Sequence, residues 1–136
     1  MTVYVFDSSA MIRYLDNEAG AGRVEQILSE CVAMRAVGVL TAVQWGEIAG
    51  NTRQRFGETE EMRVVTNFPP SEITIVPVTA ERAKIAADLK VDRKIPYADA
   101  FALGLAMESP ENILVTADYG FKDVADLARI EFLPAK

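Results

Sequence analysis

The chain has 136 residues, 50% of them hydrophobic, and its 14 Lys and Arg against 20 Asp and Glu give a net charge of −6. This length and apolar fraction predict one globular domain spanning residues 1–136 and are not those of a disordered chain. The single Cys and the absence of His exclude an internal disulfide framework, a Cys/His zinc site and any catalytic triad or dyad that needs His. No apolar run reaches the roughly 18 residues of a membrane span, and the N-terminus lacks the pattern of a signal peptide, so we expect a cytoplasmic protein.

Short apolar runs alternate with helical patterns along the chain. Strands are expected at residues 3–6, 37–40, 73–78, 113–116 and 130–133. Helices are expected from Ser8 or Ser9 to a stop near 17–20, at about 21–35, after Thr41 through at least Ile48, at about 58–67, after Thr79 through at least Leu89, and at 97–107. Ser8 or Ser9 is expected to cap the first helix, Thr41 to open a capping box with Gln44, and Thr79 to cap a later helix. Pro69-Pro70-Ser71 is the loosest point, but each flanking segment is too short to be a separate domain. The alternation predicts an α/β fold with a parallel sheet.

Four acidic residues stand at positions where such a fold binds ligands. Asp7 ends the first strand, and Asp118 lies two residues past the fourth. Glu47 lies in the helix after the second strand, and Asp99 lies in the first turn of a later helix. Ligands of open parallel sheets bind outside the carboxyl ends of the strands. If the first strand is central, with the second and fourth beside it, the four acids converge on one pocket.

Each acid also has a purely structural interpretation. Asp7 could cap a helix, Asp118 could stabilise a turn, and Asp99 could interact with a helix dipole. Glu47 could be a solvated helical residue, but its neighbours are apolar or small. Asp99 lies in the stretch 97–104, which is otherwise almost free of polar groups. Taken together, the four acids favour a functional site.

Four carboxylates in one pocket cannot all be ionised unless a cation is bound. Two carboxylates about 5 Å apart repel each other by roughly 3 kcal/mol at an effective dielectric of about 20. Some of the acids must therefore be protonated, or a divalent metal must bind. Carboxylate ligands favour Mg²⁺ or Mn²⁺ over zinc, and such an ion could activate water for phosphodiester hydrolysis. Basic side chains that could guide a phosphate backbone are Arg13, Arg53, Arg55, Lys90, Arg93, Lys94 and Lys122.

Four segments resemble the motifs of a known family. They are Val5-Phe6-Asp7-Ser8-Ser9-Ala10, Gln44-Trp45-Gly46-Glu47-Ile48, Ile95-Pro96-Tyr97-Ala98-Asp99-Ala100-Phe101-Ala102 and Leu114-Val115-Thr116-Ala117-Asp118-Tyr119-Gly120-Phe121. In this order they resemble the PIN-domain ribonucleases, and most closely the small toxin subunits of VapBC-type toxin–antitoxin modules. The resemblance covers essentially the whole chain.

The resemblance implies a fold, an activity and a set of partners. The fold is a three-layer α/β structure with a parallel sheet of order 3-2-1-4-5 between helices. The activity is that of a Mg²⁺- or Mn²⁺-dependent endoribonuclease in which metal-activated water attacks RNA. Partners are a VapB-type antitoxin whose segment covers the pocket and a second copy of the chain in a homodimer.

The resemblance also assigns residues to this site. Asp7 and Asp99 are the chief metal-binding positions, and Glu47 and Asp118 complete the catalytic cluster directly or through water. Ser8 and Thr116 match positions whose hydroxyls support the cluster.

Two alternatives follow from the same residues. Phe6-Asp7-Ser8-Ser9 resembles the start of haloacid-dehalogenase-type phosphatases, so Asp7 could accept a phosphoryl group, although Ser9 replaces the second acid of that motif. Alternatively, the protein could be a catalytically silent module that captures a basic partner segment in its acidic pocket.

Overall fold

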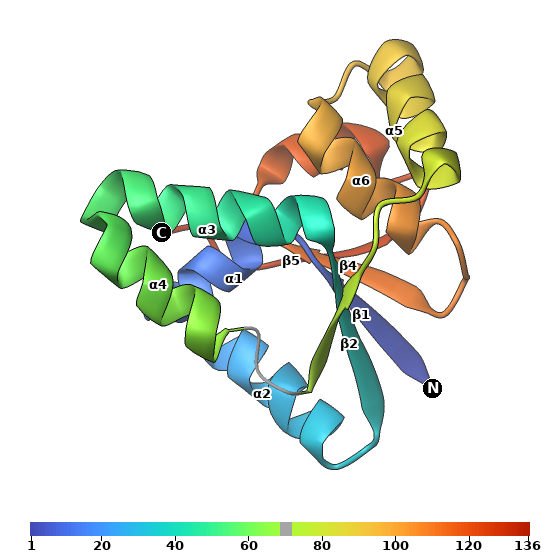
Figure 1. Cartoon of the computed structure of the whole chain (residues 1–136). Helices are drawn as coiled ribbons and strands as arrows, with labels where there is room; N and C mark the ends of the chain where they lie inside the picture. The colour runs from blue at the N-terminus through green and yellow to red at the C-terminus, as the bar shows by residue number, and fades with distance from the viewer. Residues whose placement is uncertain (69–71) are drawn as a thin grey trace.

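The computed structural model describes residues 1–68 and 72–136, which form a five-stranded sheet with helices on both faces (Figure 1). The strands are β1 (Thr2–Phe6), β2 (Ala36–Thr41), β3 (Ile73–Val76), β4 (Asn112–Thr116) and β5 (Arg129–Phe132). The α-helices are α1 (Ser8–Leu15), α2 (Ala21–Val32), α3 (Ala42–Phe56), α4 (Glu58–Asn67), α5 (Ala80–Arg93) and α6 (Tyr97–Ala106), and a 3₁₀ helix, η1, spans Tyr119–Val124. The predicted loose point at Pro69-Pro70-Ser71 lies outside the described residues.

All strand pairs are parallel, and their order is β3-β2-β1-β4-β5, which confirms the predicted fold class and sheet order. The central strand β1 pairs Val5 with Val39 of β2 on one side and with Leu114 of β4 on the other. The pairing continues one residue further, because the Asp7 amide donates to the Val115 carbonyl over 3.0 Å. The carboxyl ends of β1, β2 and β4 therefore lie side by side.

The central strands are buried on both faces, as their continuous apolar runs predict. Successive side chains of a strand point to opposite faces, and each face has its own core. Val5 and Leu114 pack with α5, α6 and η1, whereas Phe6 and Val115 pack with α1, α2, α3 and α4. Figure 1 shows α5 and α6 on one side of the sheet and α1, α2 and α4 on the other.

Local stop signals explain where two elements end earlier than expected. Helix α2 ends at Val32 rather than near residue 35, and Met34 then adopts the left-handed conformation with φ 60°. Strand β3 ends at Val76 rather than residue 78, because Pro77 has no amide hydrogen to donate to the sheet. No helix among the described residues is both long enough and apolar enough to span a bilayer.

Candidate active site

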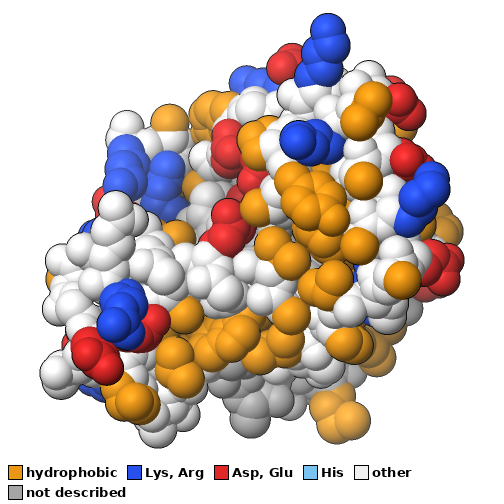
Figure 2. Space-filling view, turned by 45° about the horizontal axis from the view of Figure 1, so that its top comes forward, with side chains coloured by type: hydrophobic (Ala, Val, Ile, Leu, Met, Phe, Trp, Pro, Cys, Tyr) orange, Lys and Arg blue, Asp and Glu red, His pale blue; other side chains and the backbone are white. Residues whose placement is uncertain are grey.

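The four predicted acids are carried by four different elements at the carboxyl edge of the sheet. Asp7 follows β1, Asp118 follows β4, Glu47 lies on α3 and Asp99 lies in the first turn of α6. Figure 2 turns this edge toward the viewer and shows acidic side chains gathered in a hollow of the surface. The crossover helices after β1 and β2 thus begin at the place where an open parallel sheet binds ligands.

Asp7 is the most buried of the four acids, with 2% of its surface exposed. Its Oδ2 accepts hydrogen bonds from Ser9 Oγ at 2.7 Å and from Thr116 Oγ1 at 2.9 Å. Its Oδ1 is also buried and has no hydrogen-bond partner among the described residues. Burial raises the pKa of Asp7, the bonds from Ser9 and Thr116 oppose this effect, and the charge of Asp118 adds to it.

Glu47 is half-buried and is held by the residue that follows Asp7 in the sequence. Ser8 Oγ donates to Glu47 Oε1 over 3.0 Å. Burial raises the pKa of Glu47, the bond from Ser8 lowers it, and the negative charge of Asp7 raises it further. Neither Ser8 nor Ser9 caps the first helix, because Asp7 is the N-cap residue of α1. The two hydroxyls are instead used by two acids of the site.

Asp118 is exposed, and it also stabilises the turn that follows it, which is the structural role that its position allows. Its Oδ1 accepts a hydrogen bond from the Gly120 amide over 2.8 Å and so caps η1. Its own amide donates to Thr116 Oγ1 over 3.0 Å. Thr116 therefore links the backbone at Asp118 to the carboxylate of Asp7.

Asp99 shows that the four acids share one electrostatic environment. Its pKa is raised to about 7, first by burial and then by the negative charges of Asp7, Asp118 and Glu47. The structure thus brings together the four residues that the sequence singles out. Among the described residues, however, no three Asp, Glu or Cys side chains are arranged so that they could hold a metal ion together.

Two supporting residues were not assigned to the site from the sequence. Ser9 binds Asp7, and its Oγ also accepts a hydrogen bond from the Ala117 amide over 2.9 Å. Gln44 is fully buried, and its Nε2 donates to the Ala98 carbonyl over 2.7 Å, which joins α3 to the first turn of α6. Ser9 stands two residues after Asp7, but its side-chain contact depends on how β4 packs against α1. The position of Gln44, one helical turn before Glu47, was a signal that it faces the same side of α3.

The donor set of the site suits a hard divalent cation. All four acids offer carboxylate oxygens, the ligand type that Mg²⁺ and Mn²⁺ prefer. The unpartnered Oδ1 of Asp7 is the sharpest indication, since a buried acceptor without a donor is costly unless something else satisfies it. The residues present therefore fit such an ion.

The fold and the acidic edge define a class of protein: a parallel α/β fold with carboxylates at the carboxyl ends of its central strands. A family model described as the PIN domain matches residues 4–127, and the chain belongs to this family. No curated protein sequence matches the chain at a significant level.

Solved structures with the same fold are toxins and toxin–antitoxin complexes. VapBC2 from Rickettsia felis, solved with a promoter DNA fragment, has a TM-score of 0.73 at 13% identity and covers 98% of this chain and 100% of its own. VapC20 from Mycobacterium tuberculosis, described as a sarcin-ricin loop cleaving toxin, has a TM-score of 0.73 at 16% identity with the same coverage. A toxin–antitoxin complex from Klebsiella pneumoniae has a TM-score of 0.70 at 19% identity and covers 98% of this chain and 99% of its own. The chain thus has the fold of VapC toxins over its whole length.

Proposed function

We propose that this protein is a Mg²⁺- or Mn²⁺-dependent endoribonuclease and the toxin of a type II toxin–antitoxin module. One observation carries the proposal: four carboxylates come from four elements to one edge of the sheet, where Asp7 has a buried, unpartnered oxygen and where burial and neighbouring negative charges raise the pKa values of Asp7, Glu47 and Asp99. Such a cluster is unfavourable without a cation and is suited to binding one. Membership of the PIN domain family supports nuclease activity.

In this proposal Asp7 and Asp99 are the chief metal ligands, and Glu47 and Asp118 act directly or through water. Because no three of the described acids are arranged to hold an ion together, ordered waters would complete the coordination, as is usual for Mg²⁺. A bound divalent ion supplies an activated water and stabilises the charge that develops on the phosphodiester.

Hydroxyl groups of the chain orient these carboxylates and lower the pKa values of Asp7 and Glu47 against the effect of burial. Ser9 and Thr116 fix one oxygen of Asp7 and leave the other free, while Ser8 fixes one oxygen of Glu47. Because a cation favours ionised carboxylates, the proton that Asp99 holds near neutral pH is released when the site is filled. Metal binding should therefore be tighter at pH 8 than at pH 6.

The toxin assignment and the partners rest on the likeness to known structures. Several proteins with this fold were solved as VapBC or toxin–antitoxin complexes, which supports a VapB-type antitoxin that covers the acidic hollow. A neighbour described as cleaving the sarcin-ricin loop supports RNA as the substrate class. We further propose that the protein acts in the cytoplasm as a homodimer.

RNA cleavage by the purified protein tests the proposal. We expect cleavage in Mg²⁺ or Mn²⁺, none in EDTA, and a loss of roughly a hundredfold or more in Asp7→Asn and Asp99→Asn, which keep the side-chain shape but remove the charge. Asp88→Asn is the matched control, since Asp88 lies on the exposed surface of α5 in an ion pair with Lys84. Full activity in the Asp7 and Asp99 variants would remove the basis of the assignment.

The same protein preparations separate the alternatives. A phosphotransfer protein would be labelled at Asp7 by a small phosphoryl donor such as acetyl phosphate, whereas the nuclease would not. A silent binding module would cleave no RNA with any divalent ion.

A further inference from the structure

A cavity of about 310 Å³ adjoins the acidic site and extends it toward basic residues. It lies between the end of α5, the start of α6 and η1, and its charged lining residues are Asp99, Asp118 and Asp123 together with Arg93 and Lys94. Ile95, Pro96 and Phe121 provide apolar lining between them. The cavity next to the acidic site is therefore lined by charges of both signs.

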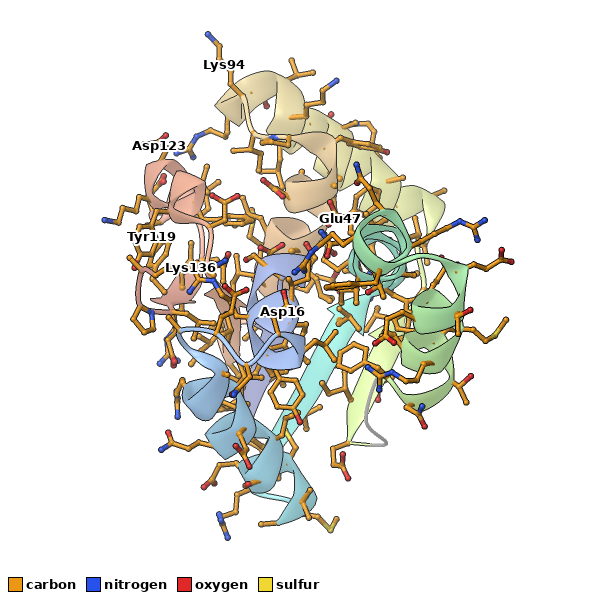
Figure 3. All side chains as sticks on the ribbon, turned by 90° about the vertical axis from the view of Figure 1, so that its left-hand side faces the viewer. Asp16, Glu47, Lys94, Tyr119, Asp123 and Lys136 are labelled. Atoms are coloured by element: carbon orange, nitrogen blue, oxygen red, sulfur yellow. The ribbon has the colours of Figure 1, made fainter. Side chains whose placement is uncertain are left out.

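The two basic residues differ in how their charges are compensated. Arg93 donates to both carboxylate oxygens of Asp126, at 2.7 and 3.2 Å, and to the carbonyl of Asp123 at 3.1 Å. Lys94 is exposed and makes no ion pair or side-chain hydrogen bond with any described residue. Figure 3 shows the Lys94 side chain extending outward from the top of the view, away from the body of the molecule. Its charge is thus free for a ligand.

The backbone at Lys94 sets the position of this side chain. Lys94 is the C-cap of α5 and has a left-handed conformation, with φ 58° and ψ 40°. This conformation costs a residue other than Gly or Asn roughly 1 kcal/mol. Unfavourable backbone geometry of this kind is concentrated at functional sites, and here it occurs at an unpaired lysine in the lining of the cavity.

From this arrangement we propose that the cavity binds one nucleotide of the RNA substrate next to the cleaved phosphodiester, with Lys94 contacting the phosphate on its far side. The inference rests on the proposed nuclease function. The volume lies at the lower end of the roughly 300–1,000 Å³ of small-molecule sites, so it suits a single nucleotide rather than a duplex. The apolar lining suits a sugar or base, and the free cation suits a phosphate.

Binding of a fluorescein-labelled, single-stranded RNA of random sequence tests the inference. All proteins carry Asp7→Asn, so that the RNA stays intact, and binding is followed by fluorescence anisotropy in Mg²⁺ over a range of KCl concentrations. Lys94→Asn is compared with Lys84→Gln, which removes one positive charge from the exposed face of the same helix. Because Asn tolerates the left-handed conformation, Lys94→Asn should keep or increase the thermal stability.

We expect Lys94→Asn to weaken RNA binding about threefold to tenfold at low salt and to reduce the slope of log K against log [KCl] by about 0.7, the value for one phosphate contact on a single strand. Lys84→Gln should change neither quantity. Equal effects of the two variants, or no effect of either, would overturn the assignment of Lys94. A poly-glutamate peptide is the second probe, and loss of peptide binding without loss of RNA binding in Lys94→Asn would instead show a protein-docking surface and overturn the inference.

Failure of this inference is distinguishable from failure of the proposed function. Cleavage is measured separately, with Asp7 intact. If cleavage requires Asp7 but Lys94→Asn binds RNA as well as the protein with Lys94 intact, only the nucleotide subsite is rejected.

Discussion

At the scale of single residues, the negative charge of Asp99 is unfavourable in the folded protein. Its folded-state pKa is about 7, raised by burial and then by Asp7, Asp118 and Glu47, whereas an Asp in an unfolded chain titrates near 4. Below about pH 4 both states are protonated and the shift has no effect on stability. Between about pH 4 and 7 the folded state binds more protons, so the stability of the metal-free protein falls as the pH rises, and above about pH 7 this loss is complete. The raised pKa values of Asp7 and Glu47 act in the same direction.

We therefore expect Asp99→Asn to stabilise the metal-free protein at pH 7.5 and to have a smaller effect at pH 5. Urea unfolding in EDTA at both pH values, for the wild type and the variant, measures this difference. Asp88→Asn, on the exposed face of α5, controls for the loss of one surface charge. A stability difference between Asp99→Asn and the wild type that does not change with pH would contradict the assignment of the raised pKa.

At the scale of elements, Gln44 determines how α3 and α6 meet. The backbone N–H of Gln44 donates to Thr41 Oγ1 over 3.2 Å, and the Thr41 hydroxyl donates in turn to the side-chain oxygen of Gln44. Its Nε2 donates to the carbonyl of Ala98, the residue before Asp99, while Glu47 stands one helical turn along α3. Gln44 thus joins the two helices that carry Glu47 and Asp99.

Gln44→Met keeps the volume of the side chain but removes its hydrogen bonds, which leaves the Ala98 carbonyl without this donor. We expect a loss of about 1–3 kcal/mol in the free energy of unfolding. We also expect faster hydrogen exchange in the first turn of α6, where the Ala100 amide bonds to the Pro96 carbonyl. Gln54→Met, at an exposed position of the same helix, is the control and should change neither measurement.

Elements were more predictable from the sequence than the contacts between them. Local signals located α4 at its observed bounds, ending before the prolines at 69 and 70, and placed Thr41 and Thr79 as N-caps, because these signals act over about one turn of helix. The sheet order came from the resemblance of motifs and not from residue patterns. The 3₁₀ helix after Asp118 was not expected, since a short segment containing Gly120 has little periodicity. The bonds from Ser9 and Gln44 join segments that are far apart in the sequence, so they depend on packing that local patterns do not encode.

At the scale of the whole molecule, the two cores on either side of the sheet hold β1 rigidly between β2 and β4. Val5 and Phe6, the last residues of β1, are completely buried on opposite faces, so the chain enters the site at Asp7 from a fixed position. This support allows four like charges to be kept together in a chain whose net charge is already −6. The repulsion is opposed by the packing of the whole chain together with the hydrogen bonds that Ser8, Ser9 and Thr116 donate within the site.

Filling the site should therefore stabilise the whole domain. An ion that binds only the folded state adds about 2.7 kcal/mol at a concentration one hundred times its Kd, so Mn²⁺ or Mg²⁺ should raise Tm in a concentration-dependent way. The gain should be largest above pH 7, where the metal-free site is most fully ionised, and Asp7→Asn should abolish most of it because it removes the charge beside the unpartnered buried oxygen. Differential scanning calorimetry with Mn²⁺ titrated against EDTA-treated protein gives the measurement, with Asp88→Asn as the surface control. An equal shift of Tm in the wild type and in Asp7→Asn would place the stabilising ion somewhere other than this edge of the sheet.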